Sequence, residues 1–161
     1  MRILVDTNVF LEFFLDREKT KAVKDFFLNC HRLKNDIYIS SMSLRDIEYT
    51  AHKTFHDKTI AKKVQMGAYK IASKVLSISS SDAIESIYSD VDDYEDALLV
   101  EAAKREMLNL IVTINKKDFV NAGFPVFSPE EFNDAVRKIM EWTPLFFSTK
   151  NTSDRIINWN R

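Results

Sequence analysis

Five aspartates stand at points of the sequence where strands are expected to end or helices to begin. They are Asp6, Asp46, Asp93, Asp96 and Asp118. Carboxylates gathered at one place repel each other, which raises their pKa values or demands a compensating cation. Carboxylate oxygens are hard ligands that suit Mg²⁺, Mn²⁺ or Ca²⁺. With a single cysteine and three histidines in the chain, a zinc site is not expected.

Each of these acids also has an ordinary structural interpretation. Asp6 and Asp118 fit turn or capping positions, and Asp46 stands three residues after Ser43, the spacing of a capping box. Asp93 and Asp96 suit the positive end of a helix dipole. Their spacing of three also puts them on one helix face, while Glu95 is expected to point elsewhere. Convergence of all five at one place is what favours the chemical interpretation.

The apolar patterns place these acids on an alternation of strands and helices. Short β-branched and aliphatic runs predict strands, and apolar residues at helical spacing predict helices. Strands are expected at 2–5, 37–40, 75–78, 110–114 and 125–127, and helices at 9–15, 20–33, from about 43, 58–73, 80–87, 93–107 and 128–141, with a helical turn at 116–120.

This alternation predicts an α/β fold, a three-layer α/β/α sandwich around a mainly parallel central sheet of four to five strands. In such sheets ligands bind beyond the carboxyl ends of the strands, where the connecting helices also begin. All five aspartates map to that edge. The fold class therefore supports the idea of one acidic site.

Composition limits what the chain can be. Its 161 residues, 45% hydrophobic, suit one domain, expected at 1–141 with an extension of unknown role at 142–161. The formal net charge of −1 provides no strong field for a polyanion, which would need local patches or metal. Two glycines leave no material for a glycine-rich phosphate loop. Single cysteine usage and the absence of a long apolar run predict a cytoplasmic protein without a membrane span.

Four segments, taken in order, resemble the motifs of PIN domains, including the VapC-like toxin ribonucleases. The apolar strand followed by 6–10 (DTNVF) is similar to the first motif, and Ser40 with an acid six residues later is similar to the second. The segments 93–98 (DYEDAL) and 111–119 (IVTINKKDF) look like the third and fourth. Each motif alone is weak. Together they cover roughly residues 1–127 and are fairly specific.

The resemblance implies a metal-dependent endoribonuclease. It assigns catalysis and the binding of one or two Mg²⁺ or Mn²⁺ ions to Asp6, Asp46, Asp96 and Asp118, and a supporting role as ligands to Asp93, Asn115 and Glu48. The second acid of the family is more often Glu, whereas the aligned position here holds Asp46. Thr7 is a candidate for orienting a carboxylate, although a turn hydroxyl explains it equally well.

The same resemblance implies RNA as substrate and a small antitoxin protein and a second copy of the chain as partners. Cations beside the motifs are candidates for phosphate contacts, whereas other basic pairs are usually solvated. The candidate substrate-binding residues are Lys53, Lys116, Lys117, Asn8 and Ser40. Weaker candidates, which solvated helix faces usually explain, are Lys62, Lys63, Lys104 and Arg105. The candidate base-stacking residues are Tyr49 and Tyr94. The apolar tail residues Phe146, Phe147 and Trp159 could serve a protein contact.

Two other functions compete with this interpretation. The first is a catalytically weak PIN fold that binds RNA or acts as a scaffold, favoured if Asp46 cannot replace Glu. The second is a phosphatase or receiver domain in which an aspartate after the first strand is phosphorylated. That class usually carries a second acid two residues later or a lysine after a late strand, and the 6–8 segment (DTN) lacks the second acid.

Overall fold

The computed structural model describes residues 1–142, and five strands form its central sheet. Neighbouring strands are all parallel and follow the order β3-β2-β1-β4-β5. The strands are β1 (Arg2–Val5), β2 (Asp36–Ser40), β3 (Lys74–Leu76), β4 (Leu110–Val112) and β5 (Val126–Phe127). The short, proline-preceded β5 lies at an edge, where proline is tolerated. The predicted sheet is therefore confirmed.

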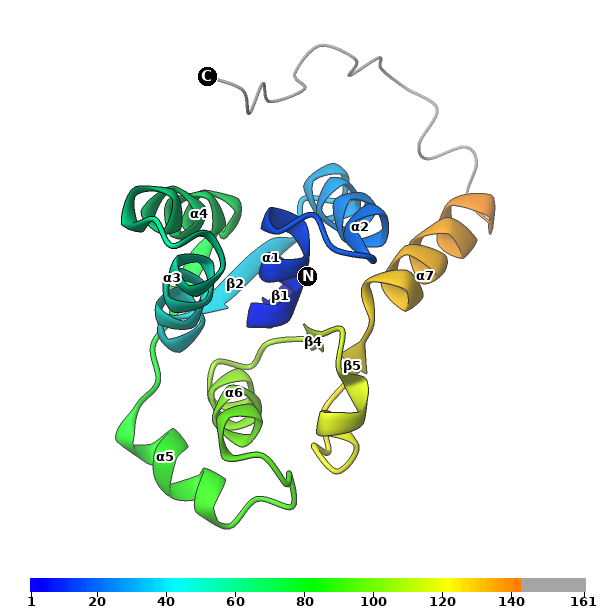
Figure 1. Ribbon diagram of the computed structural model, residues 1–161. Helices are drawn as coiled ribbons and strands as arrows, with labels where there is room; N and C mark the ends of the chain where they lie inside the picture. The colour runs from blue at the N-terminus through cyan, green and yellow to red at the C-terminus, as the bar shows by residue number, and fades with distance from the viewer. Residues whose placement is uncertain (143–161) are drawn as a thin grey trace.

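Helices cover both faces of this sheet (Figure 1). One face is packed by five helices, α1 (Thr7–Phe14), α2 (Thr20–Arg32), α3 (Ser41–Phe55), α4 (Lys58–Ile71) and α7 (Pro129–Trp142). The other face is packed by α6 (Tyr94–Arg105) and the 3₁₀ turn η1 (Lys116–Phe119), with α5 (Ser80–Ile87) packed against α6. The three-layer α/β/α architecture is as predicted.

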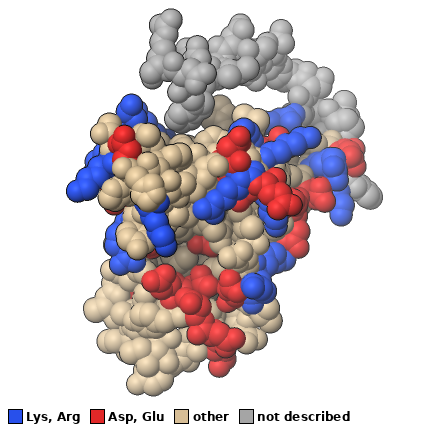
Figure 2. Space-filling view, in the orientation of Figure 1, with Lys and Arg blue, Asp and Glu red and all other residues tan. Residues whose placement is uncertain are grey.

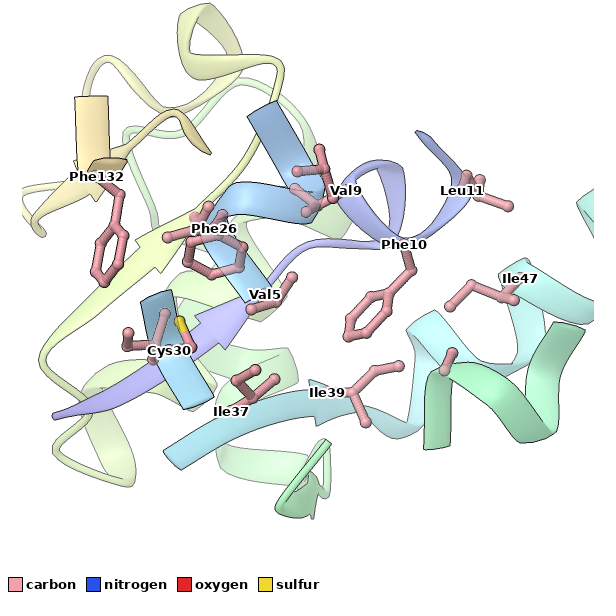
Figure 3. Packing of buried hydrophobic residues seen from close by; sticks show 14 of the residues in the cluster. Val5, Val9, Phe10, Leu11, Phe26, Cys30, Ile37, Ile39, Ile47 and Phe132 are labelled. Carbon is pink, nitrogen blue, oxygen red and sulfur yellow. The ribbon is translucent and has the colours of Figure 1, made fainter. Parts of the chain in front are cut away.

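Side chains of β1, the central strand, point alternately to the two faces of the sheet and so contribute to two cores. Ile3 and Val5 belong to the cluster on one face and Leu4 to the cluster on the other, and all three are fully buried. Strands buried on both faces read as continuous apolar runs, which is the pattern of β1. In the larger core, Phe10, Phe26 and Phe132 are buried, so these aromatic side chains serve packing (Figure 3).

The start of α3 differs from its predicted position. Ser40, not Ser43, is the N-cap, because its Oγ accepts a hydrogen bond from the Ser43 backbone N–H at 2.8 Å. Strand β2 runs directly into α3, so Ser43 is already the third helical residue and is buried. Asp46 is consequently in the second turn of the helix and is not part of a capping box.

The last helix, α7, starts where the sequence predicts it, and a capping box forms there. The Glu131 N–H donates to Ser128 Oγ at 3.2 Å, and the Ser128 N–H donates to Glu131 Oε2 at 2.8 Å. The helix packs on α2 through Phe132, whose ring meets Phe26 edge-on at 5.1 Å. It ends at Trp142, so the expected extension, with Phe146, Phe147 and Trp159, lies beyond the described residues.

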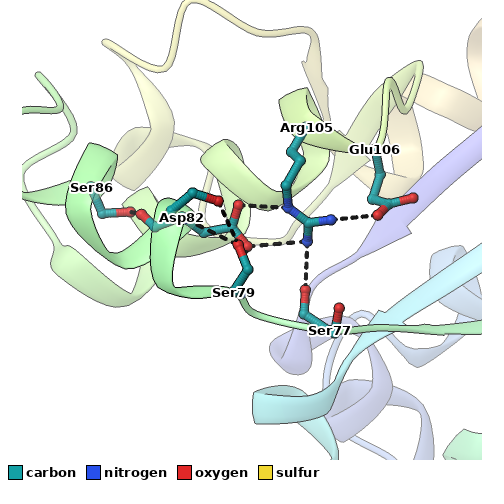
Figure 4. A network of polar contacts seen from close by, with 7 residues as sticks. Ser77, Ser79, Asp82, Ser86, Arg105 and Glu106 are labelled. Carbon is teal, nitrogen blue, oxygen red and sulfur yellow. Dashed lines mark hydrogen bonds and ion pairs between the residues drawn. The ribbon is translucent and has the colours of Figure 1, made fainter.

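Arg105 joins α6 to α5 through a polar network (Figure 4). Its Nε donates to Asp82 Oδ1 at 2.8 Å, and its Nη2 donates to Asp82 Oδ2 at 3.1 Å and to the Ser77 carbonyl at 2.8 Å. The Asp82 side chain is 2% exposed. Arg105 is therefore a structural residue here, and not the solvated cation that the sequence suggested.

No helix in the described part of the chain is both long and apolar enough to cross a membrane.

Candidate active site

An open pocket of about 270 Å³ lies where the strands end and several helices begin. Its lining comes from segments far apart in the sequence. The polar lining residues are Asp6, Thr7, Asn8, Ser40, Ser43, Asp46, Asp93, Glu95, Asp96, Asn115 and Asp118. Figure 2 shows acidic side chains gathered beside a hollow in the middle of this face, with Lys and Arg side chains around them. The predicted convergence of the five aspartates is what the structure shows.

Asp6 lies at the floor of the pocket, between β1 and α1. Its backbone N–H donates to the Val112 carbonyl at 3.0 Å, which extends the pairing of β1 with β4. Burial raises the pKa of the Asp6 carboxyl to about 6, although hydrogen bonds from Thr113, Thr7 and Asn8 oppose the shift. A group with such a pKa titrates close to neutral pH.

Thr113 orients the Asp6 carboxylate, a role that the sequence did not reveal. Its Oγ1 donates to Asp6 Oδ2 at 2.8 Å and accepts from Asn8 Nδ2 at 3.2 Å. Asn8 Oδ1 in turn accepts from the Ile114 N–H at 3.1 Å, so Asn8 ties α1 to the segment after β4. The register of β1 and β4 explains this contact. Val5 pairs with Val112, so the residues that follow them, Asp6 and Thr113, lie side by side.

The start of α6 contributes three acids. Asp93 is the N-cap, and its Oδ1 accepts from the Glu95 and Asp96 N–H groups at 2.8 and 3.2 Å. Burial raises the pKa of Asp96 to about 7, and the charges of Asp6, Asp93, Asp118 and Glu95 add to the rise. These carboxylates therefore act on one another electrostatically across the pocket.

The expectation that Glu95 points elsewhere is wrong, because Glu95 lines the pocket. Glu95 and Asp96 stand four and three residues before Leu99, which also lines the pocket, so all three lie on the side of α6 that faces it. Asp93 reaches the same pocket from the N-cap position.

Asp46 lines the pocket from α3, whereas Glu48 does not. The Oδ1 of Asp46 accepts hydrogen bonds from Arg45 Nε at 2.9 Å and Nη2 at 2.7 Å. Ser40 also reaches the lining, but it is fully buried and its hydroxyl caps α3. Ser40 therefore has a structural role as the N-cap of α3.

The predicted phosphate-binding lysines are not part of the lining. Lys53 and Lys117 are exposed, and Lys116 is tied to Glu131, with its Nζ 2.8 Å from both carboxylate oxygens. Within the described residues the pocket wall contains no Lys or Arg. Arg45, which binds Asp46 at the edge of the pocket, is thus the cation that directly contacts the acids of the described lining.

The donor set suits a hard divalent ion by its chemistry, since it consists of carboxylate, amide and hydroxyl oxygens. As placed in residues 1–142, no three Asp, Glu, His or Cys side chains form a group that could hold an ion among them. Direct ligation by the whole set is thus not a feature of this conformation.

The sequence profile described as PIN domain matches residues 2–117, and the chain belongs to this family. PIN domains are generally nucleases, so the phosphatase or receiver interpretation is set aside. No curated protein matches significantly.

Solved structures share this fold. FitAB bound to an IR36 DNA fragment matches with a TM-score of 0.64 and 18% identity, over 80% of this chain and 95% of that one. VapBC2 from Rickettsia felis, bound to a promoter DNA fragment, matches with a TM-score of 0.62 and 17% identity, over 80% and 98%. A toxin-antitoxin complex from Klebsiella pneumoniae matches with a TM-score of 0.55 and 24% identity, over 80% and 98%. At these identities the likeness shows the fold.

The raised pKa values predict that the metal-free protein loses stability as pH rises. Folded Asp6 and Asp96 titrate at about 6 and about 7, against 3.8 when unfolded. Their favourable contribution is complete below pH 3.8 and is lost as pH rises through the folded values. We expect a fall of roughly 3 kcal/mol from Asp6 at about 1.36 kcal/mol per pKa unit, and a smaller one from the half-buried, better-screened Asp96.

Urea unfolding in EDTA from about pH 5 to about pH 8 measures the upper part of this decline, which includes about half of the fall from Asp6 and the larger part of that from Asp96. The carboxyls whose folded pKa lies below the ordinary value, Asp57, Asp82 and Glu131, are ionised in both states over that range and do not obscure it. The Asp96→Asn variant should show a shallower decline. A wild-type stability that is flat or rising across the window contradicts the raised values.

Proposed function

We propose that this protein is a metal-dependent endoribonuclease that uses Mg²⁺ or Mn²⁺ and acts as the toxin of a toxin–antitoxin pair. The observation that carries the proposal is the convergence of Asp6, Asp46, Asp96 and Asp118 from four separate segments into one pocket. Folding has brought together charges that repel each other, and such an arrangement is costly unless the site has a cationic ligand. Membership of a family of nucleases supports the same conclusion.

The four catalytic aspartates would hold one or two ions, directly or through water, with Asp93 and Asn115 in support. A bound ion of this kind lowers the pKa of water and stabilises the charge of in-line attack on phosphorus. Thr113 fixes one oxygen of Asp6 by its hydrogen bond, and backbone hydrogen bonds from Thr7 and Asn8 also reach this carboxylate. The carboxylate is therefore held in a fixed orientation at the pocket. The Asp93 oxygen that caps α6 is likewise committed, which leaves its other oxygen available.

RNA would approach over the open side of the pocket. Because the wall is acidic, phosphates on either side of the cut need cations from the surroundings. Exposed Lys53 and Lys117 are available for this, whereas Lys116 would first have to leave Glu131. Tyr49 and Tyr94, 65% and 48% exposed and close in sequence to Asp46 and Asp93, are the candidates for stacking with bases.

The proposed partners follow from the structural likenesses. The Klebsiella pneumoniae structure is a toxin-antitoxin complex, and the VapBC2 and FitAB structures contain DNA. By analogy, a small antitoxin would bind this chain and block its pocket. Pairing of two copies as a homodimer is the expectation from the family resemblance. The substrate, cellular RNA, implies the cytoplasmic location that the sequence predicts.

The first experiment is cleavage of a mixed-sequence single-stranded RNA in Mg²⁺, Mn²⁺ or EDTA. We expect cuts in either metal and none in EDTA, and an Asp6→Asn sample prepared in parallel reports any co-purified nuclease. Metal binding by calorimetry without cleavage would indicate an enzyme of narrow target range. Absence of metal binding would instead support the non-catalytic RNA-binding or scaffold module.

A further inference from the structure

Arg45 makes a cationic contact to the acidic pocket. It precedes Asp46 on α3, and its Nε and Nη2 both donate to the same oxygen, Asp46 Oδ1, at 2.9 and 2.7 Å. The Arg45 side chain is 68% exposed and that of Asp46 is 27% exposed. Hydrogen bonding and charge from Asp46 raise the pKa of Arg45, and the charge of Glu95 adds to the effect. The guanidinium therefore lies where acids of both α3 and α6 act on it.

The exposure of this ion pair makes it easy to break. Exposed pairs contribute little to stability, because water screens them and ordering the long side chain costs entropy. The pair nevertheless occupies an oxygen of a carboxylate that the proposed function assigns to metal. A guanidinium and a divalent ion on that carboxylate would repel each other, so the two compete.

Arg45 is also chemically suited to another partner. Its planar fork of N–H donors fits the oxygens of a phosphate. The described pocket wall offers no Lys or Arg for such a contact. Once released from Asp46, the flexible and exposed Arg45 side chain stays at the edge of the pocket over which a nucleic acid strand would pass.

We propose that Arg45 exchanges partners: it holds Asp46 in the metal-free protein, leaves when a divalent ion takes that carboxylate, and then contacts a phosphate of single-stranded RNA. This inference rests on the proposed function and adds a substrate-positioning residue to it. It predicts that loss of the guanidinium has opposite effects on metal and on RNA.

Isothermal titration with Mn²⁺ tests the first half. In Arg45→Ala the Kd for Mn²⁺ should fall at least about threefold, the effect of removing one like charge a few ångströms away in a water-exposed site. Arg45→Lys keeps the charge and should stay near wild type. Arg137→Ala is a matched control, because Arg137 donates to Asp134 at 2.8 Å and is 66% exposed, while its partner Asp134, unlike Asp46, does not line the pocket.

Fluorescence anisotropy with a labelled single-stranded RNA, in Ca²⁺ and with the RNA checked for integrity, tests the second half. In Arg45→Ala the Kd for RNA should rise several-fold, and the slope of log K against log salt should lose about 0.7, the value of one phosphate contact on a single strand. Arg45→Lys should recover part of both, and Arg137→Ala should change neither.

The outcomes separate this inference from the function on which it rests. An unchanged or weaker Mn²⁺ affinity in Arg45→Ala overturns the exchange, and so does an unchanged salt slope. A wild-type protein that binds no Mn²⁺ contradicts the proposed function itself. Tighter Mn²⁺ binding together with the smaller salt slope, absent from Arg137→Ala, supports the exchange.

Discussion

Replacing Asp6 with Asn is expected to reduce metal-dependent RNA cleavage at least about a thousandfold. The ion at such a site contributes several kcal/mol of transition-state stabilisation, and each step of about 1.36 kcal/mol is tenfold in rate. Asp6 is a buried acid of the pocket lining, and a neutral amide cannot replace the charge of its carboxylate. Single-turnover cleavage of a single-stranded RNA in Mn²⁺ measures the loss.

The same variant should fold normally. The amide oxygen introduced by Asp6→Asn can still accept the Thr113 hydroxyl, and the desolvated charge is gone, so the metal-free variant should be more stable than wild type near neutral pH. Added Mn²⁺ should raise the Tm of wild type and leave that of the variant nearly unchanged. Glu48→Gln, outside the pocket, is the matched control. Wild-type cleavage by Asp6→Asn would place the reaction elsewhere.

Replacing Arg105 with Ala is expected to cost about 2–4 kcal/mol in the free energy of unfolding. The change removes the cationic partner of the Asp82 carboxylate, which is 2% exposed. The expected cost lies between that of an unsatisfied buried acceptor and that of a broken buried ion pair. Urea unfolding at neutral pH measures the difference. The pair also joins α5 to α6, so its loss should weaken the packing of these two helices.

A double variant isolates the ionic part of this effect. Arg105→Ala with Asp82→Asn removes both charges and should recover part of the lost stability, because no buried charge is left unpaired. Arg137→Ala, which breaks an exposed pair, should change stability by less than about 1 kcal/mol. A loss in Arg105→Ala no larger than that of Arg137→Ala would show that the network contributes little.

Local patterns predicted most of the architecture because they reflect local physics. The strand formed by the apolar run of β1 and the helix that starts after Ser128 were both found where predicted. Ser40 and Ser43 both have the chemistry of an N-cap, and the choice depended on where β2 leaves the sheet. Ser40 still pairs with Leu76, so the helix can begin only after it.

The site was predictable in its acids and much less so in their partners. The aspartates could be placed at one edge because parallel strands end together. Thr113, Glu95 and Arg45 were missed, since they depend on a strand register, on which side of α6 faces the pocket and on a side-chain direction, respectively. Lys116 looked available for RNA and Arg105 looked solvated, but they bind Glu131 and Asp82.

The sequence by itself determined the order of strands and helices, the alternating burial of β1 and the types of oxygen ligand that the chain can present. These properties depend on the spacing of side chains along a few turns or one strand. Only the tertiary structure decided which cations are paired, which acids reach the pocket and how far their pKa values rise. Such properties depend on distances between segments that lie far apart in the sequence, and packing of the whole fold sets those distances.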